Sequence, residues 1–87
     1  MINQKVTIKL KFGLHARPAG TFAKLAQKYQ CDVKVNCDNK EFNAKSVMGM
    51  IAVGAKYGSQ IEIICNGSDE TIALKELIDA VNSGLGE

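Results

Sequence analysis

Strict alternation of apolar and polar residues marks the first strand of this chain, over residues 5–11. A period of two is typical of a strand with one buried face. The same alternation predicts strands over residues 31–37, 40–44 and 60–65. Asp38 and Asn39 are turn residues, so they join the second and third strands as a hairpin. Ile64 makes both faces of the fourth strand partly apolar, and we therefore expect that strand to be central.

Between the first and second strands the period changes to that of a helix, which begins at Ala16. Pro18 fits the first helical turn, where a missing N–H costs little. The apolar stripe that we expect this helix to bury consists of Ala19, Phe22, Ala23, Ala26 and Tyr29. The opposite face carries Arg17, Thr21, Lys24 and Lys28.

Two further helices are predicted from their capping residues. Ser46 caps a short apolar helix over residues 47–53. Ser68 caps a last helix that Gly84 ends, with Asp69 and Glu70 in its favourable first turn. The buried stripe of that helix is Leu74, Leu77, Ile78 and Val81.

The order β-α-β-β-α-β-α predicts an α+β fold. We expect an open-faced two-layer sandwich, with a four-stranded antiparallel sheet and three helices on one face. An 87-residue chain fits one domain, residues 1–87. Its 46% apolar and 23% charged residues argue against disorder. No apolar run is long enough for a membrane span and no signal-peptide core is seen, so we expect a cytoplasmic protein that does not contact the membrane directly.

The charge is divided unevenly along the chain. Residues 1–60 hold ten of the eleven basic groups and three acids, a net charge of +7, whereas residues 61–87 carry a net charge of −5. The basic part is a candidate surface for an acidic partner, although a solvated lysine face would give the same pattern.

Three cysteines, Cys31, Cys37 and Cys65, are an odd number for a disulfide framework. Their spacing also lacks the close pairs of a zinc site. We expect all three to be small buried apolar side chains, and we expect no metal and no cofactor.

The single histidine and the single arginine lie two residues apart, in residues 13–19, Gly-Leu-His-Ala-Arg-Pro-Ala. The first N–H groups of the helix, near Ala16 and Arg17, favour anions and phosphate in particular. Arg17 adds a planar fork for phosphate oxygens. A nucleophilic imidazole at His15 could therefore be phosphorylated transiently. The alternative is that His15 merely caps the helix and Arg17 is a surface charge.

Three apolar residues in a second segment have two possible roles: Met48, Met50 and Ile51. They could form an exposed patch for partners, but periodicity alone favours packing into the core.

Residues 13–19 resemble the active-site signature of the HPr family, the phosphocarriers of the bacterial sugar phosphotransferase system. Residues 45–49, Lys-Ser-Val-Met-Gly, resemble the regulatory serine segment of that family, of the Gram-positive type. The ending over residues 82–87 is also similar, so the resemblance covers the whole chain.

The resemblance implies that His15 accepts a phosphoryl group at Nδ1 from phosphorylated Enzyme I, which phosphoenolpyruvate charges. His15 would pass the group to a sugar-specific Enzyme IIA while Arg17 steadies its oxygens. The protein would be a carrier, not an independent enzyme, and we expect a monomer.

The resemblance also implies that HPr kinase/phosphorylase phosphorylates Ser46, and that the product serves the catabolite-control repressor as corepressor. By the same resemblance, Met48 and Ile51 would bind partners, although periodicity alone favours packing of both residues into the core. The residues expected to meet partners are Gly20, Lys24, Lys28, Val47, Met48 and Ile51.

Two positions depart from the commonest pattern of the family. Phe12 replaces a small polar residue, and Gly20 stands where many relatives carry Thr or Ala. We expect both to affect partner affinity and neither to touch the pair of His15 and Arg17.

Other functions stay open from the sequence. A paralogue of the nitrogen-related phosphotransferase branch would share His15, and a regulator-only relative would keep Ser46 without the histidine. From a different class, a small basic nucleic-acid-binding module could use the basic segment. Stacking aromatics are missing from the predicted strands, however, and we expect no direct contact with nucleic acid.

Overall fold

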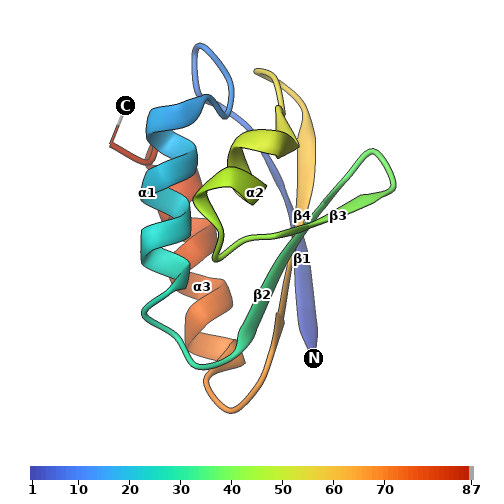
Figure 1. Cartoon of the computed structure of the whole chain (residues 1–87), viewed down its shortest axis with the longest axis vertical. Helices are drawn as coiled ribbons and strands as arrows, with labels where there is room; N and C mark the ends of the chain where they lie inside the picture. The colour runs from blue at the N-terminus through green and yellow to red at the C-terminus, as the bar shows by residue number, and fades with distance from the viewer. Residues whose placement is uncertain (87) are drawn as a thin grey trace.

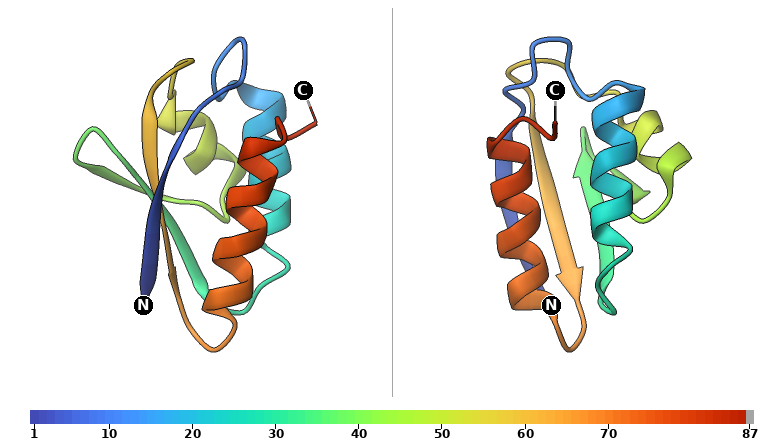
Figure 2. Two further views of the ribbon diagram at one scale, coloured as in Figure 1. Left: turned by 180° about the vertical axis from the view of Figure 1, so that it is seen from behind. Right: turned by 90° about the vertical axis from the view of Figure 1, so that its left-hand side faces the viewer.

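Four strands form one antiparallel sheet, and three helices lie against one of its faces (Figures 1 and 2). This computed structural model describes residues 1–86. The elements in chain order are β1 (Ile2–Thr7), α1 (Ala16–Ala26), β2 (Asp32–Cys37), β3 (Lys40–Asn43), α2 (Val47–Val53), β4 (Gln60–Asn66) and α3 (Glu70–Asn82). The predicted fold class and element order are therefore confirmed.

The strand order is β1-β4-β2-β3, so β4 is central as predicted. It pairs with β1 from Ile2–Cys65 to Thr7–Gln60, and with β2 from Asp32–Asn66 to Asn36–Glu62. Side chains that point toward the helices are buried, among them Val6, Val33, Val35, Ile61, Ile63 and Cys65. The helices bury against them Phe22, Ala23, Leu74, Leu77 and Val81. The alternation of the sequence thus reports which face of each strand is dry.

The turn between β2 and β3 has the chemistry that the sequence predicts. Asp38 and Asn39 both adopt left-handed backbone, with φ of 53° and 65°. Two successive left-handed residues form the tight turn that matches the twist of an antiparallel hairpin. This hairpin extends away from the helices in Figure 1.

The first strand differs from its predicted range, because β1 begins at Ile2 and ends at Thr7. Its ladder with β4 stops at Thr7, and Ile8 bonds instead to the loop before β4, donating to Ser59 O at 2.8 Å. Ile8 and Leu10 remain buried, at 0% and 1% exposure. The alternation therefore continues past the strand, since it follows burial and not ladder hydrogen bonds.

Helix α1 is shorter than its apolar stripe suggested. It ends at Ala26, and the half-buried Tyr29 packs against the core from the turn that follows. The N–H groups of Lys28 and Tyr29 donate to carbonyls three residues earlier in the chain. These short-range hydrogen bonds form tight turns that end the helix.

The start of α3 corrects the prediction for Ser68, which is exposed and does not cap the helix. Asp69 is the N-cap residue, but its side chain makes no capping bond. The Asp69 carboxylate instead accepts hydrogen bonds from Gln30 N at 2.8 Å and Cys31 N at 2.9 Å. It therefore ties the start of α3 to the connection between α1 and β2.

The three cysteines are free and buried, as predicted. Burial raises the pKa of the Cys31 thiol to about 12, and a hydrogen bond with Asp69 adds to the shift. Burial also raises the pKa of Cys37 and of Cys65. All three thiols are therefore protonated near neutral pH and pack as small apolar groups.

Asp69→Asn should make the protein less stable at neutral pH, with a deficit that shrinks as the pH falls below about 4. The N–H groups of Gln30 and Cys31 lower the pKa of Asp69. The carboxylate therefore stabilises the fold above its unfolded pKa, and that contribution is lost as the pH falls through the folded pKa. Urea unfolding at several pH values measures the difference. Asp79→Asn, an exposed position on the same helix, is the control, and an equal pH dependence in both variants would contradict this role.

Candidate functional site

His15 lies where the connection from β1 enters α1, and it is exposed. It is the N-cap residue, with extended backbone at φ −83° and ψ −174°, and its carbonyl accepts from Ala19 N at 2.9 Å. Its imidazole makes no capping hydrogen bond to the helix. His15 therefore caps α1 through its backbone carbonyl and not through its side chain.

The first turn of α1 presents N–H groups beside the imidazole. Ala16 and Arg17 open the helix and precede Pro18, which has no N–H. Such N–H groups have no carbonyl within the helix to bond, and they carry the positive end of the helix dipole. No acidic residue occurs in this first turn. The exposed guanidinium of Arg17 adds a full positive charge, so the end of α1 is suited to an anion such as phosphate.

The backbone before His15 is held by the loop before β4. Leu14 is buried and donates to Ala55 O at 2.7 Å. Gly13 has a φ of +72°, and a Cβ there would lie 2.6 Å from Ala55 O. Only glycine combines this conformation with so close an approach of two backbones. The position of His15 therefore depends on a contact between two loops far apart in the sequence.

Phe12 lies beside His15, against our expectation that it would not touch the site. The two ring centroids are 6.4 Å apart and the ring planes make an angle of 74°. The Lys11 ammonium lies 5.4 Å from the centroid of the Phe12 ring. Periodicity gives no sign of this contact, because Phe12 follows the last buried residue of the alternating segment, Leu10. An exposed aromatic two residues after Leu10 was the available signal.

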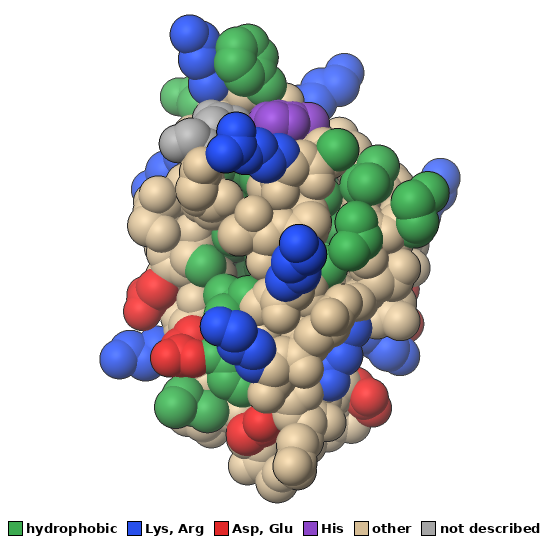
Figure 3. Space-filling model, turned by 60° about the vertical axis from the view of Figure 1, so that its left-hand side comes forward, with side chains coloured by type: hydrophobic (Ala, Val, Ile, Leu, Met, Phe, Trp, Pro, Cys, Tyr) green, Lys and Arg blue, Asp and Glu red, His purple; other side chains and the backbone are tan. Residues whose placement is uncertain are grey.

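Basic side chains continue along α1 from the site. Arg17, Lys24 and Lys28 are all exposed. Figure 3 shows the single histidine toward one end of this face, with Lys and Arg side chains below it. Lys28 lies two residues beyond Ala26, the last residue of α1. An acidic partner would meet a row of positive charge here.

Ser46 caps α2 as predicted. Its Oγ accepts a hydrogen bond from Gly49 N at 3.0 Å. Gly49 has little space, because a Cβ there would lie 2.5 Å from Asn43 O. Gln27 Nε2 donates to Lys45 O at 2.8 Å, which joins the end of α1 to the residue before Ser46. Ser46 therefore lies at the start of a short helix that is hydrogen-bonded, through Lys45, to the end of α1, the helix that carries the basic side chains.

The apolar residues of α2 divide into core and surface. Met50 is fully buried, so core packing is correct for this residue. Met48 is 72% exposed, and Val47 and Ile51 are half-buried. Gly20 of α1 is also half-buried, and a Cβ there would meet Val47 Cγ1 at 4.0 Å. The contact between α1 and α2 therefore carries a patch of partly or fully exposed residues on which a partner could dock: Gly20, Val47, Met48 and Ile51.

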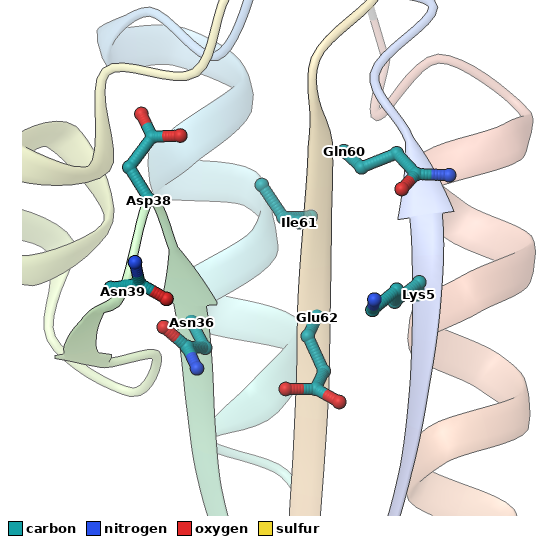
Figure 4. A pocket seen from close by; sticks show the side chains of 7 residues that line it. All are labelled: Lys5, Asn36, Asp38, Asn39, Gln60, Ile61 and Glu62. Carbon is teal, nitrogen blue, oxygen red and sulfur yellow. The ribbon is translucent and has the colours of Figure 1, made fainter.

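A separate hollow lies on the open face of the sheet, with the helices behind it (Figure 4). Its lining includes Lys5, Asn36 and Glu62, from three neighbouring strands. Their mixed charges and shallow setting select no one ligand, and the hollow is on the opposite side of the sheet from α1 and α2. It does not include any of the predicted site residues.

Within residues 1–86, no group of three or more His, Cys, Asp or Glu side chains is arranged to hold a metal ion. Over the same residues, no helix has the length and apolar character needed to cross a membrane.

Comparison with known proteins gives one consistent result. The family model described as the PTS HPr component phosphorylation site matches residues 2–83. The chain belongs to the HPr family.

Relatives span nearly the whole chain. It is 42% identical to the HPr-like protein Crh of Bacillus subtilis, over 88% of this chain and 91% of Crh. It is 36% identical to the phosphocarrier protein HPr of Neisseria meningitidis serogroup A, over 100% of this chain and 98% of that protein. The crystal structure of HPr from Thermoanaerobacter tengcongensis matches with a TM-score of 0.94 at 41% identity, covering 100% of this chain and 98% of that one. An HPr dimer from the same organism has also been solved.

Gly13→Ala should destabilise the protein more than Gly58→Ala. Both glycines have positive φ, but a Cβ at Gly58 meets nothing within 4 Å. Gly58→Ala should therefore cost only the strain of a left-handed residue, about 1–2 kcal/mol. Gly13→Ala adds a clash with the Ala55 carbonyl. Chemical unfolding of both variants measures the two costs, and equal values would show that the contact between the loops is not rigid.

Proposed function

We propose that this protein carries phosphoryl groups from phosphorylated Enzyme I to a sugar-specific Enzyme IIA, with His15 as the acceptor. Membership of the HPr family supports a phosphocarrier of the phosphotransferase system. The observation that carries the assignment to His15 is the exposed position of its imidazole at the positive end of α1, beside Arg17. The protein acts as a carrier, and its own substrate is the phosphoryl group.

The transfer needs few parts on this chain. The lone pair of His15 Nδ1 attacks phosphorus, a P–N bond forms, and the bond between phosphorus and Enzyme I breaks with its electron pair left on Enzyme I. The N–H groups of Ala16 and Arg17 and the Arg17 guanidinium face the phosphoryl oxygens and stabilise their charge. The same steps in reverse release the group to Enzyme IIA. An exposed site suits two successive partners because each must reach the same atom.

Docking of both partners uses the surface that α1 and α2 share. Arg17, Lys24 and Lys28 attract an acidic partner. Gly20, Val47, Met48 and Ile51 supply apolar area beside them, of which the 72% exposed Met48 is the most prominent.

Regulation acts through Ser46. We infer that HPr kinase/phosphorylase modifies its hydroxyl and that the catabolite-control repressor binds the product. The similarity to Crh supports this regulatory branch. The presence of His15 favours a carrier over a regulator-only protein. The outward positions of β4, Gln60, Glu62, Ile64 and Asn66, hold no aromatic for stacking on bases, which disfavours nucleic-acid binding.

We infer a cytoplasmic, monomeric protein in which residues 1–87 form one domain. One contiguous core and the pairing of β1 with β4 of the same chain support this arrangement. Because a dimer of a related HPr has been solved, light scattering at working concentration is the direct check.

His15→Ala should abolish phosphorylation by Enzyme I and phosphoenolpyruvate while leaving the fold intact. His15 is the only imidazole in the chain and is exposed, so its loss should change stability by only about 0.5 kcal/mol. Labelled phosphoenolpyruvate with acid treatment measures the effect, because phosphohistidine is labile in acid and phosphoserine is not. Acid-labile label that still forms on the variant would refute the assignment.

Ser46→Asp should slow Enzyme I-dependent phosphorylation of His15 without unfolding the protein. A negative charge at the N-terminus of α2 should stabilise the fold slightly, by about 0.3–1 kcal/mol. The same charge opposes docking of an acidic partner on the adjacent basic helix, so the defect should shrink at high salt.

Ser46→Asn is the matched control, because asparagine caps a helix as well as aspartate but has no charge. Transfer rates at low and high salt, beside thermal melts, separate the two effects. An equal loss of rate in both variants, or normal transfer by Ser46→Asp at low salt, would exclude an electrostatic switch.

A further inference from the structure

Phe12 is an apolar ring kept at the surface beside the reacting side chain. It is 73% exposed, so burial does not explain its position. Its ring makes a T-shaped contact with the His15 imidazole, at 6.4 Å between centroids and 74° between planes. Aromatic pairs favour this geometry at centroid distances of about 4.5–7 Å. The contact is therefore an attractive one that acts directly on the imidazole.

The backbone makes this contact a fixed feature of the site. Gly13 N donates to Leu10 O at 2.9 Å, and His15 N donates to Gly13 O at 3.0 Å. Leu14, which lies between the two residues in the sequence, is buried, and its N–H donates to Ala55 O. These bonds hold the Cα atoms of Phe12 and His15 in one relative position.

A second side chain restrains the phenyl ring. The Lys11 ammonium lies over it at 5.4 Å from the centroid, within the range of a cation–π contact. The Phe12 ring thus contacts both a cation and the imidazole.

An imidazole needs such a restraint because it has two nitrogens and a broad terminal torsion. Rotation of the ring about that torsion exchanges the nitrogen that faces the end of α1. Phosphoryl transfer requires one nitrogen in line with phosphorus, and misorientation lowers the rate. An aromatic ring packed edge-to-face against the imidazole restricts this rotation by its shape and by the attraction between the two rings.

We propose that Phe12 is a positioning residue that holds the His15 imidazole with one nitrogen toward the incoming phosphorus. This inference rests on the proposed function of His15. It assigns to Phe12 an effect on the chemistry of His15, separate from any part in partner affinity.

The first test uses phosphoramidate, a small donor that needs no protein partner. The P–N bond of the donor breaks, a P–N bond to His15 forms, and ammonia leaves. Phosphorus NMR then reads the ratio of the two phosphohistidine isomers. The wild type and Phe12→Tyr, which keeps the ring, should give one isomer, whereas Phe12→Leu and Phe12→Met should give a mixture.

The second test is the kinetics of Enzyme I-dependent transfer. Phe12→Leu should lower kcat by about three- to tenfold and leave KM within about twofold, and Phe12→Tyr should restore kcat. Ile72→Ala, which trims an apolar side chain that is 54% exposed on α3, should change neither constant. Thermal melts should be the same for all variants, because Phe12 is not part of the core.

Three results would overturn the proposal. The first is a wild-type isomer ratio in Phe12→Leu and Phe12→Met. The second is a rise in the KM of Phe12→Leu with no change in kcat, which would make Phe12 a docking contact. The third is failure of Phe12→Tyr to restore kcat. If Enzyme I does not phosphorylate even the wild type, the proposed function fails, and the isomer ratio with phosphoramidate still decides the role of Phe12.

Discussion

The hydrogen bond from Leu14 N to Ala55 O joins the two loops on which the site depends. One loop leads from β1 into α1, and the other leads from α2 into β4. Gly13 lets the two backbones approach, and Leu14 anchors the first loop in the core. The ladder of β1 and β4 brings both loops to the same end of the sheet. His15 is thus placed by the sheet, although it belongs to no strand.

The chemistry of the site follows from what this end of the fold leaves exposed. The start of α1 offers N–H groups and Arg17 to an anion, and no acidic side chain opposes them within the first turn. A carrier must give up its phosphoryl group as readily as it takes it. For the proposed carrier, an open surface at a helix end serves this need, because each partner would supply its own side of the transfer site.

The contact between α1 and α2 joins the proposed regulatory serine to the proposed transfer site. Lys45 reaches back to the end of α1, where its ammonium donates to Tyr29 O at 2.7 Å. The backbone of Lys45 accepts from Gln27, so Ser46 is fixed beside the basic helix. A charge at Ser46 would therefore alter the surface proposed for partner docking while His15 and its loops keep their places.

Much of the fold could be read from the sequence because its signals are local. Alternation gave the dry face of each strand, Asp38 and Asn39 gave the hairpin turn, and Ser46 gave the start of α2. The motif around His15 and Arg17 also predicts an anion-binding helix end. Each of these predictions depends only on residues within a few positions of one another.

The remaining features needed the tertiary structure, because they depend on segments far apart in the sequence. The end of β1 was set by where its ladder with β4 stops, and alternation continued beyond it. The Asp69 carboxylate does not cap its own helix but accepts hydrogen bonds from the N–H groups of Gln30 and Cys31, which fold next to it. The contact of Phe12 with His15 required a turn at Gly13 whose shape is fixed by Ala55. The sequence by itself pointed to His15 and Arg17 as the residues proposed to carry the chemistry, because their motif is local. Long-range packing decided how those residues are held and what lies beside them, because a backbone contact with a distant loop leaves no periodic trace in the chain.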